Sequence, residues 1–277
     1  MKIACCICGK IGGAKGKDGK GGKEKEILEL SYKHFKDHIL DKNDTIDFFI
    51  HCWDTDMEKE VTDLYKPKSS HFEKQKYFDI PKCFKVGVKS KKTEPNRPNN
   101  IYSRFYSTKE SVKLKMDYEK EHGFKYDCVL LCRFDIAWQK DIIFSNHNME
   151  DFHVANLCSY RHKGKRIDMI DFYKNRSHYK KLPIDHRHVG YPYRENSWGL
   201  WDQWFFSNSN NMDKFSNVFD NIEKHIKINS RLQDEVSSHL LCEVQLKHVG
   251  LEKRIKFPLH FLEDTPMTRL WYYNYFN

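Results

Sequence analysis

The sequence predicts an α/β fold in which helices flank a mixed, mostly parallel central sheet. One observation is the order of segments at the start of the chain, where an apolar strand over residues 2–8 precedes a helical pattern and a second β-rich segment over 45–53. Another is the segment "YDCVLLCRFDIAW" over 126–138, which carries a continuous apolar stretch before Arg133. Continuous apolar strands separated by helices are typical of parallel sheets that are buried on both faces. Such sheets bind their ligands at the carboxyl ends of the strands.

The composition is that of a folded protein, and we expect it in the cytoplasm. Hydrophobic residues make up 39% of the 277 residues and aromatic residues 14%, enough for a substantial core. We expect no membrane span and no signal peptide, because no apolar segment approaches the roughly 20 residues that cross a bilayer. The nine cysteines lie mostly in apolar segments, where thiols are ordinary buried side chains. The "CCIC" of the first strand lacks the spacing of a zinc knuckle, so we expect no metal there.

A glycine- and lysine-rich loop follows the first strand. Residues 9–25 contain seven glycines and six lysines, and with Asp18 and Glu24 they supply +4 of the net charge of +9. The loop is not a P-loop, since no Gly-Lys pair has a glycine at the required spacing before it or a Ser or Thr after it. It does not match the dinucleotide-binding pattern either. The sequence leaves open whether this loop is simply solvated or contacts phosphate.

The middle elements follow from periodicity and from breaker residues. Apolar residues at helical spacing predict a helix directly after the loop. A second helix is predicted from about residue 100 to 121, where Gly123 closes it. A weak edge strand precedes this helix, in the region of "SSHFEKQKYFD" and "CFKVGV".

The second half of the chain continues with a strand over 152–158. Residues 159–197 are polar and irregular, with the length of a lid or an acceptor loop. The segment "WGLWDQWFFSN" predicts a turn into a short strand, and two helices are expected over 211–226 and about 230–247. There are no repeats and no interdomain linker, so we expect residues 1–277 to form a single domain.

Arg133 and Asp135 come at the end of the central strand. A buried strand does not end in two charged side chains unless they meet a partner. The two residues share a face of the strand and lie at the edge where α/β sheets bind ligands. They therefore predict a binding site, and a structural ion pair of Arg133 with Asp135 or another neighbour is the alternative.

Five segments together resemble the nucleotide-sugar glycosyltransferases of the GT-A fold. They are "MKIA.CI.G", "DFFIHCWD", "YD.VLLCRFDI", "DQWFFS" and "L..E...HLL", in this order over roughly residues 1–250. The similarity is to a viral and bacterial group in which R-x-D replaces the usual D-x-D. It implies a GT-A-like domain with a nucleotide-binding half over 1–125 and a metal and acceptor half over 126–277. It also implies transfer of a sugar from a UDP- or GDP-sugar to a hydroxyl of a glycan or another acceptor.

The resemblance implies a metal site at the end of the central strand. Asp135 matches the last aspartate of D-x-D, which in the family holds Mn²⁺ or Mg²⁺ on the donor diphosphate and so stabilises the leaving group. Arg133 replaces the first acid, which implies weaker metal binding or a direct contact of the guanidinium with ribose or phosphate. His239 is a further candidate ligand. It follows Glu235 by four residues on a predicted helix, a spacing that suits a shared ligand or a surface ion pair.

Residues after the first two strands are expected to contact the nucleotide. Gly9 and Lys10 match the place where family members carry a cation, so Lys10 is expected to touch the diphosphate. His51, Trp53 and Asp54 follow the second strand, where the family holds the base and ribose.

Asp54 and Asp56 also form a literal D-x-D, but at the second strand rather than the central one. Capping of the next helix by either of them is the alternative to a nucleotide contact.

Asp202 and Gln203 in "WDQWFF" resemble the acidic motif that the family places near the acceptor or the anomeric carbon. Asp202 is expected to act as a general base in an inverting enzyme or to orient the donor sugar in a retaining one. Gln203 would add a hydrogen bond to sugar, and a simple turn residue is the alternative for Asp202. Tyr106 lies on the helix that related proteins use near the diphosphate, although packing on the sheet is the alternative, and Arg104 is expected to face elsewhere.

The expected partners are therefore a nucleotide-sugar donor and a hydroxyl acceptor, and we do not expect nucleic acid. The competing hypothesis is a non-catalytic nucleic-acid or polyanion-binding protein that uses the loop 9–25. It predicts steeply salt-dependent binding of DNA or RNA, whereas the enzyme predicts metal-dependent binding of UDP or GDP.

Overall fold

The structure is a computed structural model. It describes residues 1–12, 23–87, 96–155, 199–261 and 263–268, together with the backbone of three short strands between 160 and 187. Within these ranges no helix is both long enough and apolar enough to cross a membrane.

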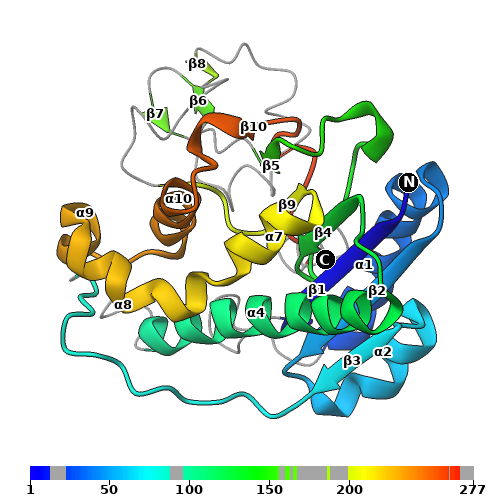
Figure 1. The fold of residues 1–277 in the computed structure, drawn as a ribbon, viewed down its shortest axis with the longest axis horizontal. Helices are drawn as coiled ribbons and strands as arrows, with labels where there is room; N and C mark the ends of the chain where they lie inside the picture. Colours follow the sequence, from blue (N-terminus) through cyan, green and yellow to red (C-terminus); the bar gives the residue numbers. More distant parts are fainter. Residues whose placement is uncertain are drawn as a thin grey trace.

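A seven-stranded sheet forms the centre of the molecule, in the order β10-β5-β9-β4-β1-β2-β3 (Figure 1). Its strands are β1 (Ile3–Gly9), β2 (Ile46–Cys52), β3 (Ser69–Phe72), β4 (Cys128–Cys132), β5 (Phe152–Val154), β9 (Trp204–Ser207) and β10 (Ile255–Lys256). Only β9 runs antiparallel to its neighbours β4 and β5, while the other pairings are parallel. The predicted fold class, α/β with a mixed, mostly parallel central sheet flanked by helices, is confirmed. A separate sheet has the order β7-β6-β8, with β6 (Tyr160–His162), β7 (Lys165–Arg166) and β8 (His186–Arg187).

Helices cover both faces of the central sheet, because alternate side chains of each buried strand point to opposite faces. In β1, Ile3, Cys5 and Ile7 pack in one core cluster with α1 (Glu24–His38) and α2 (Glu58–Tyr65). Ala4, Cys6 and Cys8 pack on the other face. The helices there are α4 (Arg97–His122), α7 (Ser209–Ser216), α8 (Val218–Ile228), α9 (Ser230–Asp234) and α10 (Ser238–His248). Both faces of β1 are thus buried, which explains its uninterrupted apolar sequence. Short 3₁₀ helices cover Leu40–Lys42, Thr55–Met57, Phe144–Asn146 and Glu252–Arg254.

Several predicted boundaries change in the structure. Helix α4 is close to its prediction, and Gly123 closes it in the left-handed conformation with φ of 69°. The predicted helix over 211–226 is divided into α7 and α8 at Asn217. The predicted strand over 126–138 is a strand only over Cys128–Cys132. The predicted strand over 152–158 covers Phe152–Val154, and its last three positions lie outside the described residues, as does most of the predicted loop.

The predicted helix over 230–247 is also wrong, because the chain becomes extended at Glu235 between α9 and α10. The Val236 N–H donates to the carbonyl oxygen of Lys85 at 3.0 Å. The Ser237 hydroxyl then caps α10 by accepting from the Leu240 N–H at 3.1 Å. A tertiary backbone contact and a new N-cap therefore replace the continuous helix. As a result, Glu235 and His239 do not share a helical face.

Candidate functional site

The predicted site residues gather at the carboxyl edge of strands β2, β1 and β4. Gly9 is paired with Cys52 in the parallel register of β1 and β2, and Ile7 is paired with Cys132 of β4. The three strands therefore end near one another, and the residues that follow them emerge at the same edge. This is the edge at which open α/β sheets bind ligands.

The end of β1 is tied to the end of β2 by two hydrogen bonds. Gly9 turns the chain with φ of 107°, a conformation that favours glycine. The Trp53 N–H donates to the Gly9 carbonyl oxygen at 3.2 Å, and the Ile11 N–H donates to Asp54 Oδ2 at 2.8 Å. Asp54 thus holds the start of the glycine-rich loop, and Lys10 lies half-buried between the two contacts.

The positive charge of Lys10 affects the pKa of Asp54. Burial raises the pKa of the Asp54 carboxyl, while the Ile11 N–H and the charge of Lys10 act in the opposite direction. Asp54 makes no side-chain hydrogen bond as an N-cap of the following 3₁₀ helix, so the capping alternative does not hold for it. Asp56 is exposed. Most of the loop, residues 13–22, lies outside the described residues.

His51, Trp53 and Tyr106 form an aromatic wall next to Gly9. The rings of Trp53 and Tyr106 stack with centroids 5.6 Å apart and an interplanar angle of 27°, and His51 meets Trp53 edge-on at 4.7 Å. His51 is fully buried. Its Nδ1 lies 2.7 Å from the Ser107 hydroxyl and its Nε2 lies 3.1 Å from Glu73 Oε1. This geometry favours a supporting role for His51, while the half-buried Tyr106 is open to contact a ligand.

Arg133 and Asp135 form a bidentate ion pair at the end of β4. Arg133 Nε donates to Asp135 Oδ1 at 2.8 Å, and Arg133 Nη2 donates to Asp135 Oδ2 at 2.7 Å. Asp135 is completely buried, whereas the Arg133 side chain is 21% exposed. The ion pair that the sequence offers as the alternative to a binding site is present. It gives the partly exposed Arg133 side chain a fixed orientation.

The expected Mn²⁺ or Mg²⁺ fits these residues poorly. Both oxygens of Asp135 already accept a hydrogen bond from a permanent cation. A dication bound to the same carboxylate would be repelled by Arg133 by several kcal/mol, on the order expected for charges about 4 Å apart near a protein surface. The Arg133 guanidinium therefore occupies the position at Asp135 that a cation would take.

Asp202 lies near His239, Arg104 and Arg133. His239 Nδ1 is 3.4 Å from Asp202 Oδ1, and these side chains are 28% and 13% exposed. The same His239 nitrogen lies 3.0 Å from the Leu200 carbonyl oxygen. Burial raises the pKa of Asp202, but the charges of His239, Arg104 and Arg133 outweigh it and lower the pKa to about 2. Asp202 is therefore a carboxylate at every physiological pH.

Arg104 belongs to the site, and the expectation that it faces elsewhere was wrong. Its Nη1 donates to Cys8 Sγ at 2.7 Å and to Thr108 Oγ1 at 3.1 Å. Its Nη2 donates to the Asp202 carbonyl oxygen. Helical periodicity put Arg104 off the predicted apolar stripe, but α4 packs along the ends of the strands, so a second face of the helix is also buried. The only indication in the sequence was the position of Arg104 between apolar residues of a long predicted helix.

Two buried polar atoms in the residues flanking Asp202 have no hydrogen-bond partner within the part of the chain that the structure describes. They are Gln203 Oε1, an acceptor, and Trp201 Nε1, a donor. The backbone of Gln203 is fixed, because its carbonyl oxygen accepts from the Arg133 N–H at 3.2 Å. The Trp201 ring is held between His239, at 5.0 Å, and Phe261, at 4.4 Å. Buried polar atoms without partners are costly. Trp201 Nε1 can donate to a hydroxyl group of a ligand, and Gln203 Oε1 can accept from one.

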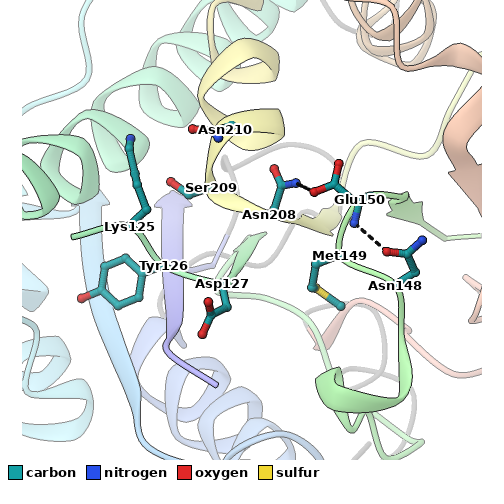
Figure 2. Close-up of a pocket in the computed structure, with 9 residues that line it drawn as sticks. All are labelled: Lys125, Tyr126, Asp127, Asn148, Met149, Glu150, Asn208, Ser209 and Asn210. Atoms are coloured by element: carbon teal, nitrogen blue, oxygen red, sulfur yellow. Dashed lines mark hydrogen bonds between the residues drawn. The ribbon is translucent and has the colours of Figure 1, made fainter.

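A small polar cavity lies at the opposite end of the strands and is separate from this site. It has a volume of about 400 Å³ and lies between the start of β4 and the start of α7. Figure 2 shows Lys125 and Ser209 on one side of it and Glu150, bonded to Asn208 at 2.8 Å, on the other. Because parallel sheets bind their ligands at the carboxyl ends of the strands, we do not place the active site in this cavity.

Comparison with known proteins gives similarity of structure only. No family model and no curated sequence matches the chain. Mouse xyloside xylosyltransferase 1 aligns over 92% of this chain and 84% of its own, with 11% identity and a TM-score of 0.41. The 4-diphosphocytidyl-2C-methyl-D-erythritol synthase of Anaerococcus prevotii aligns over 99% and 95%, with 9% identity and a TM-score of 0.45. A nucleoside-diphosphate-sugar pyrophosphorylase of Vibrio cholerae aligns over 96% and 95%, with 11% identity and a TM-score of 0.39. These similarities concern the overall arrangement of the chain, and none of them bears on the chemistry of the site.

Proposed function

We propose that this protein is a glycosyltransferase that moves a sugar from a UDP- or GDP-sugar to a hydroxyl of a glycan or another acceptor. The observation that carries the proposal is the position of Asp202, a partly buried carboxylate near Arg133 and His239. Its neighbours in the chain, Trp201 and Gln203, each carry a buried polar atom that has no partner among the described residues. Cations suit a diphosphate, and neutral donors and acceptors suit a sugar. Both kinds of group meet at the edge of the sheet where ligands are expected.

Lys10, Arg133 and the aromatic wall would bind the nucleotide part of the donor. Trp53 is buried and stacks on the half-buried Tyr106, so the exposed part of the Tyr106 side chain would meet the base. Lys10 and the exposed part of Arg133 provide positive charge at the ends of β1 and β4. The orientation of Arg133 is fixed by Asp135 before any ligand binds, so little entropy is lost when its guanidinium contacts phosphate oxygens.

Asp202 is better suited to orient and stabilise the donor sugar than to act as a general base. A general base is most effective when its pKa lies near the working pH. The pKa of Asp202 is lowered to about 2, so its carboxylate is a weak proton acceptor and a permanent negative charge. Such a charge stabilises the positive charge that develops at an anomeric carbon as the leaving group departs. Gln203 and Trp201 would then hold sugar hydroxyls.

Charge neutralisation of the leaving diphosphate is assigned to Arg133 rather than to a metal at Asp135. The two hydrogen bonds of the ion pair support this assignment. We also propose a cytoplasmic location, since all eight cysteines in the described part of the chain are free thiols.

Binding of nucleotides tests the proposal. Isothermal titration calorimetry should show binding of UDP or GDP by the wild-type protein, with and without EDTA. Lys10→Ala should weaken nucleotide binding. Asp56→Asn, which changes an exposed carboxylate of the D-x-D after β2, is the control and should leave the affinity unchanged. Absence of nucleotide binding, together with steeply salt-dependent binding of RNA or DNA, would favour the polyanion-binding protein instead.

A further inference from the structure

Three side chains with metal-binding atoms converge at the edge of the sheet next to β3. His51, His71 and Glu73 each offer one ligand atom, and these atoms all lie within 4.8 Å of one another. His51 is fully buried, Glu73 is partly buried and His71 is exposed. Nothing in the proposed sugar transfer requires this cluster.

The backbone fixes the cluster before any ion binds. His51 and His71 are register partners on the adjacent parallel strands β2 and β3, so their side chains leave the sheet on the same face. Glu73 follows β3 and stays in the ladder, because its N–H donates to the Cys52 carbonyl oxygen at 3.1 Å. His71 and Glu73, two residues apart, also share that face.

One of the distances is close to that of a tetrahedral site. Two ligand atoms bound at 2.0–2.1 Å to a tetrahedral metal lie about 3.4 Å apart. The contact between His51 Nε2 and Glu73 Oε1 is 3.1 Å, so this edge needs only a small adjustment. His71 must move closer, and its exposed ring has no hydrogen-bond partner among the described residues to hold it back.

Ser107 prepares His51 as a ligand. Its hydroxyl lies 2.7 Å from His51 Nδ1 and can donate to the His51 carbonyl oxygen at 3.3 Å. Without a metal, Nε2–H donates to Glu73 Oε1 at 3.1 Å. When a cation replaces that proton, the Ser107 hydroxyl oxygen can accept from Nδ1–H, and Nε2 binds the cation through its lone pair. Metal-binding histidines usually donate their other N–H in this way.

We propose that His51, His71 and Glu73 bind a transition-metal dication, with Zn²⁺ as the best match. Two imidazoles and one carboxylate are a common set of protein ligands for zinc and leave a fourth position for water. Imidazole nitrogens disfavour Mg²⁺, which prefers oxygen ligands. Lys76 Nζ lies 2.8 Å from Glu73 Oε2 and leaves Oε1 as the available oxygen. The Lys76 side chain is 44% exposed, so solvent screens its charge from a cation better than at the buried pair of Arg133 and Asp135.

A bound cation would fix the edge of the nucleotide site. It would cross-link the edge strand β3 to β2 through side chains. His51 contacts both Trp53, at 4.7 Å, and Tyr106, at 5.7 Å, so the metal would also hold the ring that supports this wall. Because burial and Ser107 already hold His51 without a cation, the metal would stabilise this edge of the sheet, and nucleotide binding and sugar transfer should not require it.

Calorimetric titration of the metal-free protein with Zn²⁺ tests the proposal directly. The wild-type protein should bind one equivalent of Zn²⁺. His71→Ala and Glu73→Gln should each lower the affinity for Zn²⁺ at least tenfold. Ser107→Ala should weaken it about tenfold or more, as expected for a partner that orients a ligand. The control is His122→Ala, which removes another exposed histidine, at the end of α4. Excess Mg²⁺ should not displace the ion.

Co²⁺ absorption separates this site from a site built on cysteines. The expected spectrum has visible bands of cobalt bound to nitrogen and oxygen, without a thiolate-to-metal band, and the bands should change in His71→Ala. Circular dichroism should show that this variant, which alters an exposed side chain, is folded. The proposal is overturned if the wild type binds no Zn²⁺, if His71→Ala and Glu73→Gln bind it as tightly as the wild type, or if the cobalt ligands are thiolates.

Discussion

The Arg133 guanidinium holds both carboxylate oxygens of Asp135, with Nε and Nη2 at 2.8 Å and 2.7 Å. This pair lies at the end of the central strand β4. It fixes the orientation of the Arg133 guanidinium in the candidate site. A D-x-D sequence at this position would present two negative charges and would need a metal to meet a diphosphate. In this chain we propose that the Arg133 guanidinium supplies the positive charge instead.

Asp135→Asn should reduce stability as well as activity. It leaves Arg133 without its anionic partner at a position where the partner is completely buried, so we expect a loss of about 1–3 kcal/mol in the free energy of unfolding. Urea denaturation followed by circular dichroism measures it. Asp56→Asn, at an exposed position, is the matched control. Equal midpoints for wild type and Asp135→Asn would show that the ion pair does not support the fold.

Arg133→Lys should lower turnover and weaken nucleotide binding, since a lysine cannot reproduce the two parallel hydrogen bonds to Asp135. EDTA should not affect the wild type in the same assay. A strict requirement for Mn²⁺ in the wild type would contradict the assignment of charge neutralisation to Arg133.

Asp202→Asn should lower kcat about a hundredfold or more, because it removes the negative charge proposed to stabilise the transition state. The KM for the donor should change much less, since the amide keeps the shape of the side chain. Steady-state kinetics with the accepted nucleotide sugar separate the two effects. A large rise in KM with unchanged kcat would assign Asp202 to ground-state binding instead.

Asp202 should also contribute to the acid sensitivity of the fold. Its pKa is about 2 in the folded protein, below its ordinary value of 3.8. A lowered folded-state pKa gives stability that is present above pH 4 and is lost as the pH falls toward 2, here about 2 kcal/mol. Stability curves of wild type and Asp202→Asn should therefore converge between pH 4 and 2. Parallel curves over this range would mean that the surrounding cations do not stabilise the carboxylate.

His153 should make the fold less stable below neutral pH. Burial lowers its pKa from 6.5 to about 4, and its ring stacks on Phe206 at 4.2 Å. The folded state prefers the neutral ring, so its contribution is complete above pH 6.5 and declines as the pH falls toward 4. His153→Gln should flatten the dependence of the unfolding free energy on pH in this window. The prediction fails if wild type and variant lose stability with the same slope.

The sequence predicted the sheet because the sheet depends on local patterns. Continuous apolar strands such as β1 indicated burial on two faces, and the charged residues after β4 indicated the edge of the sheet at which we propose the site. Parallel pairing then brings Gly9, Trp53 and Arg133 to one edge without any further information.

The remaining parts depend on contacts between distant segments. Arg104 lies 98 residues from Asp202, whose carbonyl oxygen it binds, and no periodicity of α4 indicates that contact. Glu73 joins His51 only because the weak edge strand β3 pairs with β2. The helix interruption at Glu235 depends on the Val236 contact with Lys85, which local helix propensity does not encode.

The most direct test of the proposed function is a turnover assay with a panel of UDP- and GDP-sugars. Release of the nucleoside diphosphate is measured with EDTA present, for the wild type, Asp202→Asn and Asp56→Asn. We predict that the wild type and Asp56→Asn release UDP or GDP from at least one donor at the same rate and that Asp202→Asn releases it about a hundredfold more slowly. Equal rates for Asp202→Asn and the wild type, or no release from any donor with or without Mn²⁺, would contradict the account.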